Sequence, residues 1–445
     1  MPVSVTTVGG YNEVGKNMTA VKIDDRVIVC DMGLHLESYV ATVGDEDLRK
    51  VSPESLIAAG AVPDINTIED WRKSVIAIVP THAHLDHIGA IPFLSNKFNA
   101  DILGTPFTVA VLRSILKNER IALKNKIKKI NVNSSYPFDD INIEFIGMTH
   151  STPQTAMLAI HTKYGVIIYA NDFKFDNYPT LGLKPNIKRL KELGNSGKVL
   201  CLICDSTYAW DKRKMPSEAV ARQMLKDVLL GTDCEGRGVV VTTFASHLAR
   251  LKSIIEYGKR MGRKVVLLGR SMSRYVEAGE EVGIISFTKE VEMVCYKKQI
   301  KKKLKQICEE GKHKYLLVVT GHQGEPQSTL AGMVNGDLDF DFSEGDHVVF
   351  SCQVIPTPTN QKNREHIETQ LSQKKVRIFK DIHVSGHAAR EDLRDLITYT
   401  KPKHIIPAHG EFRMTSALYD LGLEMGYQEK YLHLLKNGSR VVLTD

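Results

Sequence analysis

Short apolar runs recur along the first 210 residues, and each run ends abruptly at a polar residue. The runs are rich in β-branched residues and are separated by Gly/Asn turns, so they predict β-strands. Polar residues at strand ends are where an α/β scaffold presents reactive side chains. The clearest runs are RVIVCDMG, SVIAIVPTH, INIEFIGMTH and GVIIYANDF, whose end positions are Asp31, His82, His150 and Asp172.

A different pattern occupies residues 209–376, where apolar runs alternate with segments of helical periodicity. This alternation predicts a parallel sheet with crossover helices. Strands that end on histidines return in residues 377–445, in VRIFKDIHVSGHA and HIIPAHGE. We therefore expect residues 1–208 and 377–445 to form one domain that is interrupted by an inserted domain over residues 209–376. Residues 37–70 form a long connection that we expect to be a surface flap.

The stretch VIAIVPTHAHLDHIGAIPFL, residues 75–94, carries three histidines and an aspartate directly after an apolar run. His82 and His84 alternate along extended backbone and so project to the same side. Asp86 and His87 follow where the chain turns into a helix. Imidazole nitrogens and carboxylate oxygens suit zinc or manganese, and two such pairs are the pattern wanted for two metals about 3.5–4 Å apart. The cluster predicts a metal site.

The composition limits the class of protein. The chain has 445 residues, 42% of them hydrophobic and 25% charged, as expected for a globular protein with two or three cores. No apolar run reaches the roughly 18 residues of a membrane span, and the start, MPVSVTTVGG, has no export signal, so we expect a cytoplasmic protein without a membrane partner. Seven scattered cysteines fit a reducing compartment, and we expect Cys201 and Cys204 to be thiols packed in a core strand.

The charge balance mildly favours polyanionic partners, because the net charge is +7 and the pI is about 8.8. Residues 113–130 and 296–305 are lysine-rich at helical spacing. A solvated helix face explains either stretch alone. Together with nucleic-acid chemistry they would be possible RNA tracks or dimer surfaces.

The metal cluster carries a family resemblance. HAHLDH, at residues 82–87, resembles the signature of the metallo-β-lactamase superfamily, and VCDMG, GMTHSTP and YANDFKFD resemble its other motifs. The resemblance implies an α/β (α+β) protein with a four-layer αββα fold and two zinc ions per chain, with manganese possible. It assigns one metal to His82, His84 and His150, the other to Asp86, His87 and His409, and a bridging carboxylate to Asp172.

The inserted segment is similar to the α/β β-CASP domain of nucleic-acid-cleaving members. ICDST, HVSGHA and IPAHGE match the motifs of that group, and GGYNEVGKNM, TFASHLARL, LGRSM and GHQGEP resemble loops of the ribonuclease J family in the short form found in archaea. The resemblance implies a metal-dependent 5′→3′ exoribonuclease of RNA decay or processing. Its partner would be single-stranded RNA with a 5′-monophosphate, and a homodimer is plausible.

Specific roles follow for the remaining motif residues. Asp86 serves the metal chemistry, His387 would donate a proton or hydrogen bond to the departing ribose oxygen, and Asp205 would orient a histidine or water. Loops that enter helices favour anions at their free N–H groups. We therefore expect a pocket for the terminal 5′ phosphate; its residues are Ser246, Arg270, Ser271, Gln323 and Gly324. The SGHA turn around His387 is a separate expected substrate contact, because Ser385, Gly386 and Ala388 offer backbone N–H groups to a phosphate.

Several other functions remain open on the sequence. A β-CASP endoribonuclease and a nuclease that also cuts single-stranded DNA would use the same residues, since no feature here requires a 2′-hydroxyl. A small-molecule esterase or thioesterase would not need the large insertion. An inactive scaffold is disfavoured, because every expected ligand position is present.

Overall fold

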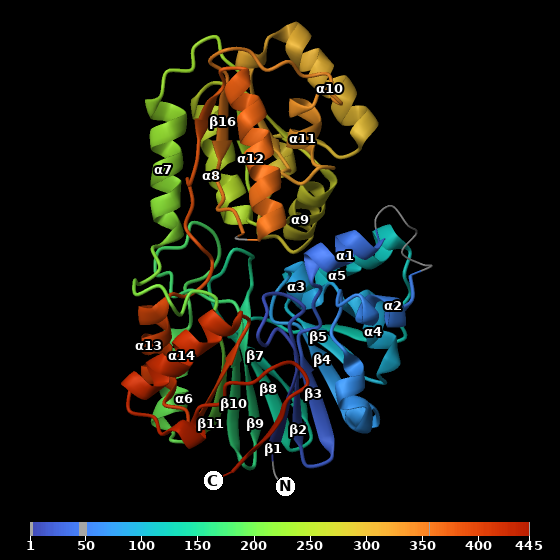
Figure 1. Ribbon diagram of the computed structural model, residues 1–445, viewed down its shortest axis with the longest axis vertical. Helices are drawn as coiled ribbons and strands as arrows, with labels where there is room; N and C mark the ends of the chain where they lie inside the picture. The colour runs from blue at the N-terminus through green and yellow to red at the C-terminus, as the bar shows by residue number, and fades with distance from the viewer. Residues whose placement is uncertain (1–2, 44–50, 356, 445) are drawn as a thin grey trace. The chain divides into compact units, whose positions relative to one another are not determined.

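The computed structural model describes residues 3–43, 51–355 and 357–444, which form two compact units (Figure 1). The first unit gathers three pieces of chain, up to residue 177, from 183 to 215, and from 386 onward. The second unit comprises residues 178–182 and 216–385. Compared with the boundaries expected at 208 and 376, the inserted stretch begins at Pro216 and ends at Ser385.

A seven-stranded mixed sheet forms one half of the core of the first unit, in the order β19-β1-β2-β3-β4-β5-β6. The strands from β19 to β3 pair antiparallel, and those from β3 to β6 pair parallel. The strands are β1 (Val3–Gly9), β2 (Met18–Ile23), β3 (Arg26–Cys30), β4 (Val75–Val79), β5 (Asp101–Gly104), β6 (Ile127–Lys129) and β19 (Arg440–Leu443).

A six-stranded sheet forms the other half, in the order β18-β11-β10-β9-β8-β7. Three antiparallel pairings connect β7 to β10, and β10, β11 and β18 run parallel. The strands are β7 (Ser134–Phe138), β8 (Ile141–Gly147), β9 (Ala156–Thr162), β10 (Gly165–Ala170), β11 (Val199–Asp205) and β18 (His404–Ala408).

The two sheets pack face to face, because one core cluster takes alternate residues from both, among them Val5, Ile28, Ile143 and Tyr169. The other face of the second sheet packs against α6 (Ile187–Asn195), α13 (Arg390–Thr400) and α14 (Phe412–Glu424). Beside the first sheet, α5 (Pro106–Glu119) packs on β5 and β6, near α3 (Leu85–Ile88) and α4 (Ile91–Leu94) (Figure 1). The predicted four-layer αββα fold is thus confirmed.

Two expectations for the first unit need correction. The lysine-rich stretch 113–130 is not one helix, because α5 ends at Glu119, Arg120 adopts a left-handed backbone conformation with φ of 55°, and the chain then forms strand β6. The expected flap over 37–70 is largely folded into α1 (Leu36–Val43), α2 (Pro53–Ala58) and η2 (Ile65–Ser74), with Leu56 and Ile68 fully buried. Residues 44–50 of that stretch lie outside the described residues.

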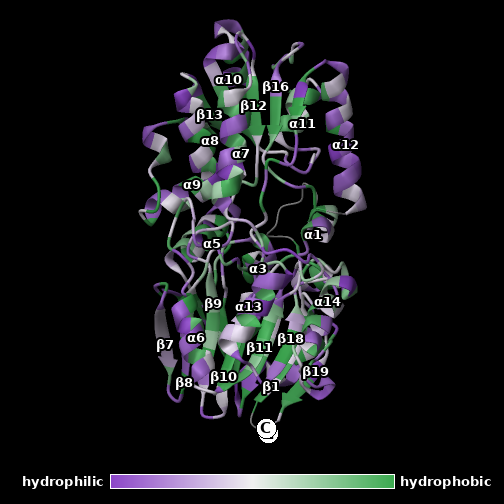
Figure 2. Cartoon of the chain, turned by 90° about the vertical axis from the view of Figure 1, so that its left-hand side faces the viewer, coloured by the Kyte–Doolittle hydropathy of each residue, from purple (hydrophilic) through white to green (hydrophobic). Residues whose placement is uncertain are grey.

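The second unit is built on a six-stranded parallel sheet, in the order β14-β13-β15-β12-β16-β17, as the strand–helix alternation predicted. Figure 2 shows β12 and β16 in green, the colour of apolar residues. The strands are β12 (Val239–Thr242), β13 (Lys264–Leu268), β14 (Glu292–Val294), β15 (Tyr315–Val319), β16 (His347–Phe350) and β17 (Arg377–Phe379).

Helices cover both faces of this sheet. Alternate strand residues, such as Val240 and Leu317, pack with α10 (Lys297–Glu310), α11 (Thr329–Val334) and α12 (Pro358–Gln373). On the opposite face Gly258 of α8 (Leu248–Arg260) lies so close to Val265 and Leu316 that a Cβ would meet the Val265 side chain at 2.6 Å. The remaining helices are α7 (Glu218–Gly231) and α9 (Arg270–Glu281). Among the described helices, none is long and apolar enough to cross a bilayer.

A buried charge network fixes the segment that leads out of the second unit toward HVSGHA. Arg250, in α8, is fully buried, and its Nε and Nη2 donate to the Glu218 carboxylate at 2.6 and 2.8 Å. Its Nη1 donates to the carbonyl oxygens of Ser351 and Ile382 at 2.9 and 3.2 Å. A buried charge is tolerated only with such complete pairing, so this network holds the end of β16 and the chain before His383 in one arrangement.

The hydrogen bond and ion pair between Arg189 of α6 and Glu144 of β8 lead to a stability prediction. Burial alone would raise the pKa of Glu144 in β8, but hydrogen bonds from His161 and Arg189 lower it to about 2. A lowered folded-state pKa adds stability above the usual carboxyl pKa near 4.5, and this contribution is lost as pH falls toward 2. We expect Glu144→Gln to cost on the order of 1–2 kcal/mol at pH 7 and to flatten the acid decline of the unfolding free energy.

Urea denaturation followed by circular dichroism at pH 7, 4 and 3 measures this effect. Glu309→Gln is the control, because the side chains of Glu309 and its partner Lys305 are both 66% exposed and their Oε1 and Nζ atoms lie 4.0 Å apart. Parallel curves for Glu144→Gln and the parent chain across this pH range would contradict the prediction.

Candidate metal centre

Strand ends from both sheets bring the predicted ligands together in the first unit. His82 follows β4, His150 follows β8, Asp172 follows β10 and His409 follows β18. The short helix α3 supplies the rest, because His84 is its N-cap and its first turns carry Asp86 and His87. All seven predicted ligands therefore meet at one edge of the paired sheets.

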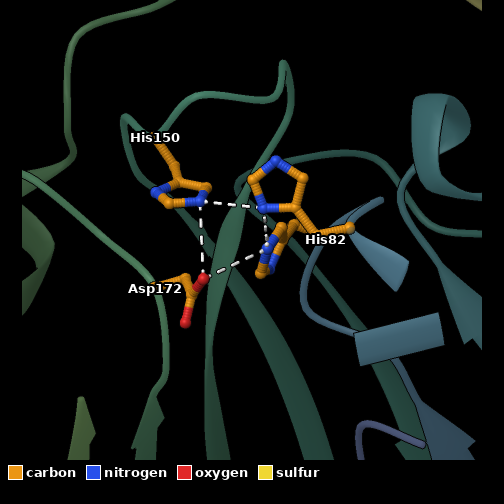
Figure 3. A group of neighbouring side chains, drawn as sticks. His82, His150 and Asp172 are labelled. Carbon is orange, nitrogen blue, oxygen red and sulfur yellow. Dashed lines mark hydrogen bonds and ion pairs between the residues drawn. The ribbon is translucent and has the colours of Figure 1, made fainter. Parts of the chain in front are cut away.

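The first donor set consists of His82, His84, His150 and Asp172. His84 Nδ1 lies 3.0 Å from His82 Nε2 and 3.1 Å from His150 Nε2. Asp172 Oδ2 lies 3.5 Å from His82 Nε2 and 3.4 Å from His150 Nε2. Figure 3 shows His82, His150 and Asp172 turned toward one another.

The second donor set consists of Asp86, His87, His409 and the other oxygen of Asp172. Asp172 Oδ1 lies 3.3 Å from His87 Nε2 and 3.4 Å from His409 Nε2. Asp86 Oδ2 lies 3.5 Å from His87 Nε2 and 3.7 Å from His409 Nε2. Each oxygen of Asp172 therefore faces a different set.

The arrangement fits divalent cations. A tetrahedral site with metal–nitrogen bonds of about 2.0–2.1 Å has ligand atoms about 3.3 Å apart, close to the 3.0–3.5 Å separations in the first set. Asp172 Oδ1 and His409 Nδ1 are buried and have no hydrogen-bond partner among the described residues. Buried polar atoms rarely stay unpaired. A bound cation would pair with the unpartnered oxygen of Asp172.

The outer nitrogens of the rings set their tautomers. Thr81 Oγ1 donates to Asp31, so His82 Nδ1 must be the donor in its 3.0 Å contact with that hydroxyl. His150 Nδ1 donates to the carbonyl oxygen of Gly386 at 2.8 Å. Both rings then present an Nε2 lone pair to the first set, which is the usual arrangement of histidine ligands.

Electrostatics also favour bound cations. Burial lowers the pKa of His82 and of His150 well below the ordinary value, so both rings are neutral. Burial would lower the pKa of His87 too, but the charges of Asp172, Asp86 and Asp31 raise it well above the ordinary value. His87 Nδ1 lies 2.7 Å from Asp31 Oδ2. The negative charge of the carboxylates around the second set therefore stabilises positive charge there, on a protonated ring or on a bound cation.

Three turns at the centre have left-handed backbone. Asp31, Asp172 and His409 have φ angles of 59°, 53° and 49°, although none is glycine. Left-handed backbone at a non-glycine residue is uncommon and persists only where the surroundings hold it. The three turns aim side chains from the ends of β3, β10 and β18 into the centre.

The two predicted catalytic partners are joined directly. His387 Nδ1 lies 2.8 Å from Asp205 Oδ2, and His387 Nε2 lies 3.9 Å from Asp172 Oδ2. Burial opposes protonation of His387, but Asp172 and Asp205 raise its pKa to about 9. Asp205 Oδ1 accepts from the backbone N–H of Thr207 at 2.8 Å. Asp205 thus orients His387.

The predicted phosphate-pocket residues lie in the second unit at loops after adjacent parallel strands. Ser246 follows β12, Arg270 and Ser271 open α9 after β13, and Gln323 follows β15. The N-cap of α9 is Gly269, which has no side chain that could cap the helix. Gln323 is already engaged, because its Nε2 donates to the Gln353 carbonyl oxygen at 3.0 Å and its Oε1 accepts from the Ile355 N–H at 2.8 Å.

The remaining substrate residues differ in environment. Gly324 has φ of 78° and lies so close to Asn363 that a Cβ would meet its backbone at 2.5 Å. A Cβ on Gly386 would meet Ser151 Oγ at 2.3 Å, so Gly386 supports His150 from close range. Ser385 is buried, and Ala388 packs in the core beneath α13.

Some residues that support the centre escaped the sequence analysis. Asn17 Nδ2 donates to the Asp86 carbonyl oxygen at 3.1 Å and lies 3.2 Å from His87 Nε2. Thr81 links Asp31 to His82. The position of Thr81, between the strand and the first histidine, offered a signal. Asn17 lies in GGYNEVGKNM, a loop singled out by its family resemblance, but its contact with His87 joins distant segments and could not be predicted.

Comparisons with known proteins cover both units. Family models match residues 13–185 (Metallo-beta-lactamase superfamily), 235–370 (Ribonuclease J, beta-CASP domain) and 374–432 (Zn-dependent metallo-hydrolase RNA specificity domain). The chain is 42% identical over 441 residues to Ribonuclease J of Methanocaldococcus jannaschii, with 98% of each chain covered. It is 42% identical over 440 residues to Ribonuclease J of Pyrococcus abyssi, covering 98% of this chain and 96% of the relative.

A crystal structure of a protein of unknown function from Enterococcus faecalis V583 matches with a TM-score of 0.66. The match covers both chains in full at 18% sequence identity. At that identity the likeness shows the fold alone.

The close packing of Gly33 against α3 generates a prediction. A Cβ at Gly33 would lie 1.6 Å from the Asp86 carbonyl oxygen and 2.7 Å from the His87 backbone nitrogen. Gly33→Ala must therefore shift the segment that carries both ligands. We expect at least a tenfold loss of metal affinity, the order seen when ligand-orienting contacts are removed, measured by titration of the metal-free chain with Zn²⁺.

Gly231→Ala is the matched control, because nothing lies within 4 Å of its added Cβ. Equal Zn²⁺ affinity for Gly33→Ala and Gly231→Ala chains of unchanged circular dichroism would show that α3 does not need its present position.

Proposed function

The chain belongs to the ribonuclease J family, and on that basis we propose that it is a two-metal ribonuclease acting as a 5′→3′ exoribonuclease. Its substrate would be single-stranded RNA with a 5′-monophosphate, consumed in RNA decay or processing. The observation that carries this proposal is the pair of donor sets that share Asp172. Family membership supports hydrolysis of RNA, and the two sets support two cations.

The residues present fit two zinc ions, and manganese would also accept this donor set. His82, His84 and His150 would hold one ion, Asp86, His87 and His409 the other, and Asp172 would contribute one oxygen to each. When bound, such a pair supplies Lewis acidity for attack on a phosphodiester. The shared carboxylate holds two cations together and offsets their mutual repulsion.

His387 would serve the leaving group. Its Nδ1 is engaged by Asp205, so its Nε2 faces the centre near Asp172. A ring fixed in this way can donate a proton or hydrogen bond to the ribose oxygen that departs when the phosphodiester breaks. Asp205 is a positioning residue that fixes the ring, as carboxylates behind a catalytic histidine commonly do.

The loops after β12, β13 and β15 are the proposed site of the terminal phosphate. Open α/β sheets bind ligands beyond the carboxyl ends of their parallel strands, and free N–H groups at helix starts favour phosphate. Arg270 is exposed in the first turn of α9, where the N-cap leaves backbone N–H groups uncapped. We assign the charge recognition to Arg270, with Ser246 and Ser271, and we assign Gln323 and Gly324 to the shape of the loop.

We further infer that the protein works as a homodimer in a reducing cytoplasm. The homodimer rests on family membership. The compartment is supported by the cysteines, because all seven are free thiols and Cys201 and Cys204 are fully buried in β11.

Removal of the second donor set tests the metal chemistry. We expect the double variant Asp86→Ala/His87→Ala to lose hydrolysis of RNA by at least a thousandfold while it keeps much of its RNA affinity. The reason is that the centre acts on the reacting phosphate, whereas binding is spread along the strand. Cleavage rates of labelled RNA and fluorescence anisotropy measure the two properties.

A matched acidic–histidine pair provides the control for that variant. Glu365 and His366 are adjacent and exposed on α12, so Glu365→Ala/His366→Ala should cleave at the parent rate. If Asp86→Ala/His87→Ala also cleaved at the parent rate, the metal mechanism would be wrong.

A time course on 5′-labelled RNA tests direction and end preference. We expect labelled mononucleotide to appear first, and faster from a 5′-monophosphate than from a 5′-hydroxyl or 5′-triphosphate end. Arg270→Ala should reduce that preference about tenfold, because it removes a charge-assisted contact to the phosphate. Matching DNA strands report selectivity for the sugar.

Internal fragments formed equally from all three ends would instead identify an endonuclease. Equal rates on RNA and DNA would extend the activity to single-stranded DNA.

A further inference from the structure

A row of flat side chains begins at His387 and leads to the surface of the first unit. Tyr208 lies 6.1 Å from His387 between ring centroids, with 30° between the planes. Trp210 stacks with Tyr208 at 6.2 Å and 23°. The Arg413 guanidinium lies over the Trp210 ring at 4.9 Å. This aromatic row, Tyr208, Trp210 and Arg413, adjoins the proposed leaving-group residue.

The fold brings the row together from two distant segments. Tyr208 and Trp210 follow Asp205 at the end of β11, and Arg413 follows His409 at the end of β18. These strands are parallel neighbours, with Asp205 opposite Ala408. The row is therefore built on the same strand ends as the site itself.

The aromatic side chains at the outer end of the row are exposed and do not pack in the hydrophobic core. Trp210 is 44% exposed and Phe412, beside Arg413, is 60% exposed, whereas the other tryptophan of the chain, Trp71, is only 3% exposed. Exposed large aromatic side chains that gather in one place mark interaction sites.

The row is nevertheless held in position. Trp210 Nε1 donates to the Thr207 carbonyl oxygen at 3.2 Å. The backbone of Tyr208 forms an isolated β-bridge with that of Ala389, two residues after His387. A flat group that is exposed and fixed loses little conformational freedom on binding.

Arg413 differs from the other arginines in its neighbourhood. Arg390 and Arg394 both pair with Glu424 at 2.6 Å. Within the described part of the chain, Arg413 has no carboxylate partner, and its contact is with Trp210. A guanidinium left without an acidic partner can stack on a base or pair with a phosphate.

We propose that Tyr208, Trp210 and Arg413 form a stacking platform for an unpaired nucleobase of the RNA, next to the phosphodiester that is cleaved. This deepens the proposed function and rests on it. Aromatic faces and arginine planes are how proteins hold splayed-out bases, and such stacking tolerates every base because each has a π-face. RNA is favoured over a protein partner because the row is continuous with His387 and its free charge is positive.

The platform carries a consequence for selectivity. A base can stack on it only when it has left its duplex partner. The site would therefore favour single strands without regard to sequence and would bind poorly wherever the base is missing.

Intrinsic fluorescence tests contact directly. The chain has two tryptophans, so Trp71→Phe leaves Trp210 as the only reporter. We expect a single-stranded oligoribonucleotide to quench this variant, after removal of metal by chelation to prevent cleavage, and a duplex or abasic strand of equal length to quench it much less. Should Trp71→Phe fail to fold, comparison of the parent chain with Trp210→Phe reports the same contact. RNA should quench the parent chain, and it should not quench Trp210→Phe, whose remaining Trp71 is buried.

A double-mutant cycle, in which the Trp210 side chain and the stacked base are removed singly and together, measures the effect of the contact on cleavage. In the parent chain, removal of the stacked base from the substrate should raise KM about tenfold and change kcat less than twofold. Trp210→Ala should raise KM on normal RNA to a similar extent and become insensitive to the missing base. Trp210→Phe should lie between them, and Leu183→Ala is the control, because Leu183 is 72% exposed outside the row.

The outcomes separate this inference from the proposed function. Cleavage of RNA by the parent chain, with no quenching and with equal abasic sensitivity in Trp210→Ala, would overturn the platform and leave the nuclease intact. Quenching by a proline-rich peptide but not by RNA would show a protein partner and would also overturn it. Absence of RNA cleavage by the parent chain would reject the proposed function itself.

Discussion

The carboxylate of Asp172 is the group around which the centre is arranged. It is almost fully buried, its two oxygens face different sets of imidazoles, and one of them has no hydrogen-bond partner among the described residues. A buried anion of this kind is costly unless cations lie beside it. The surrounding histidines, neutral by burial or held by other carboxylates, are organised so that positive charge completes the structure.

The architecture explains how so many costly groups can be held together. Four ligands, His82, His150, Asp172 and His409, follow strands whose inward-facing residues pack between the two sheets, and α3 supplies the other three. Left-handed turns at Asp31, Asp172 and His409 then redirect the side chains inward. Backbone of this kind persists only where the surrounding structure enforces it, so the packed sheets fix the geometry of the site.

Much of this could be predicted from the sequence, for a physical reason. The strand alternation of His82 and His84 and the turn before Asp86 are local, so spacing alone indicated which side chains share a face. The four-layer fold followed from the family resemblance. Contacts between distant segments could not be predicted: Asn17 against His87, or Arg413 over Trp210, depend on which strands become neighbours. The single helix expected over 113–130 failed because lysine spacing says nothing of the left-handed residue Arg120 that ends α5.

The order of the ligands along the chain has a consequence for biosynthesis. Asp172 precedes the inserted unit and His409 follows it, yet both serve the same donor set. A ribosome must therefore translate the whole insertion before the last ligand can emerge. The second donor set can therefore be completed only after the inserted unit has been synthesised.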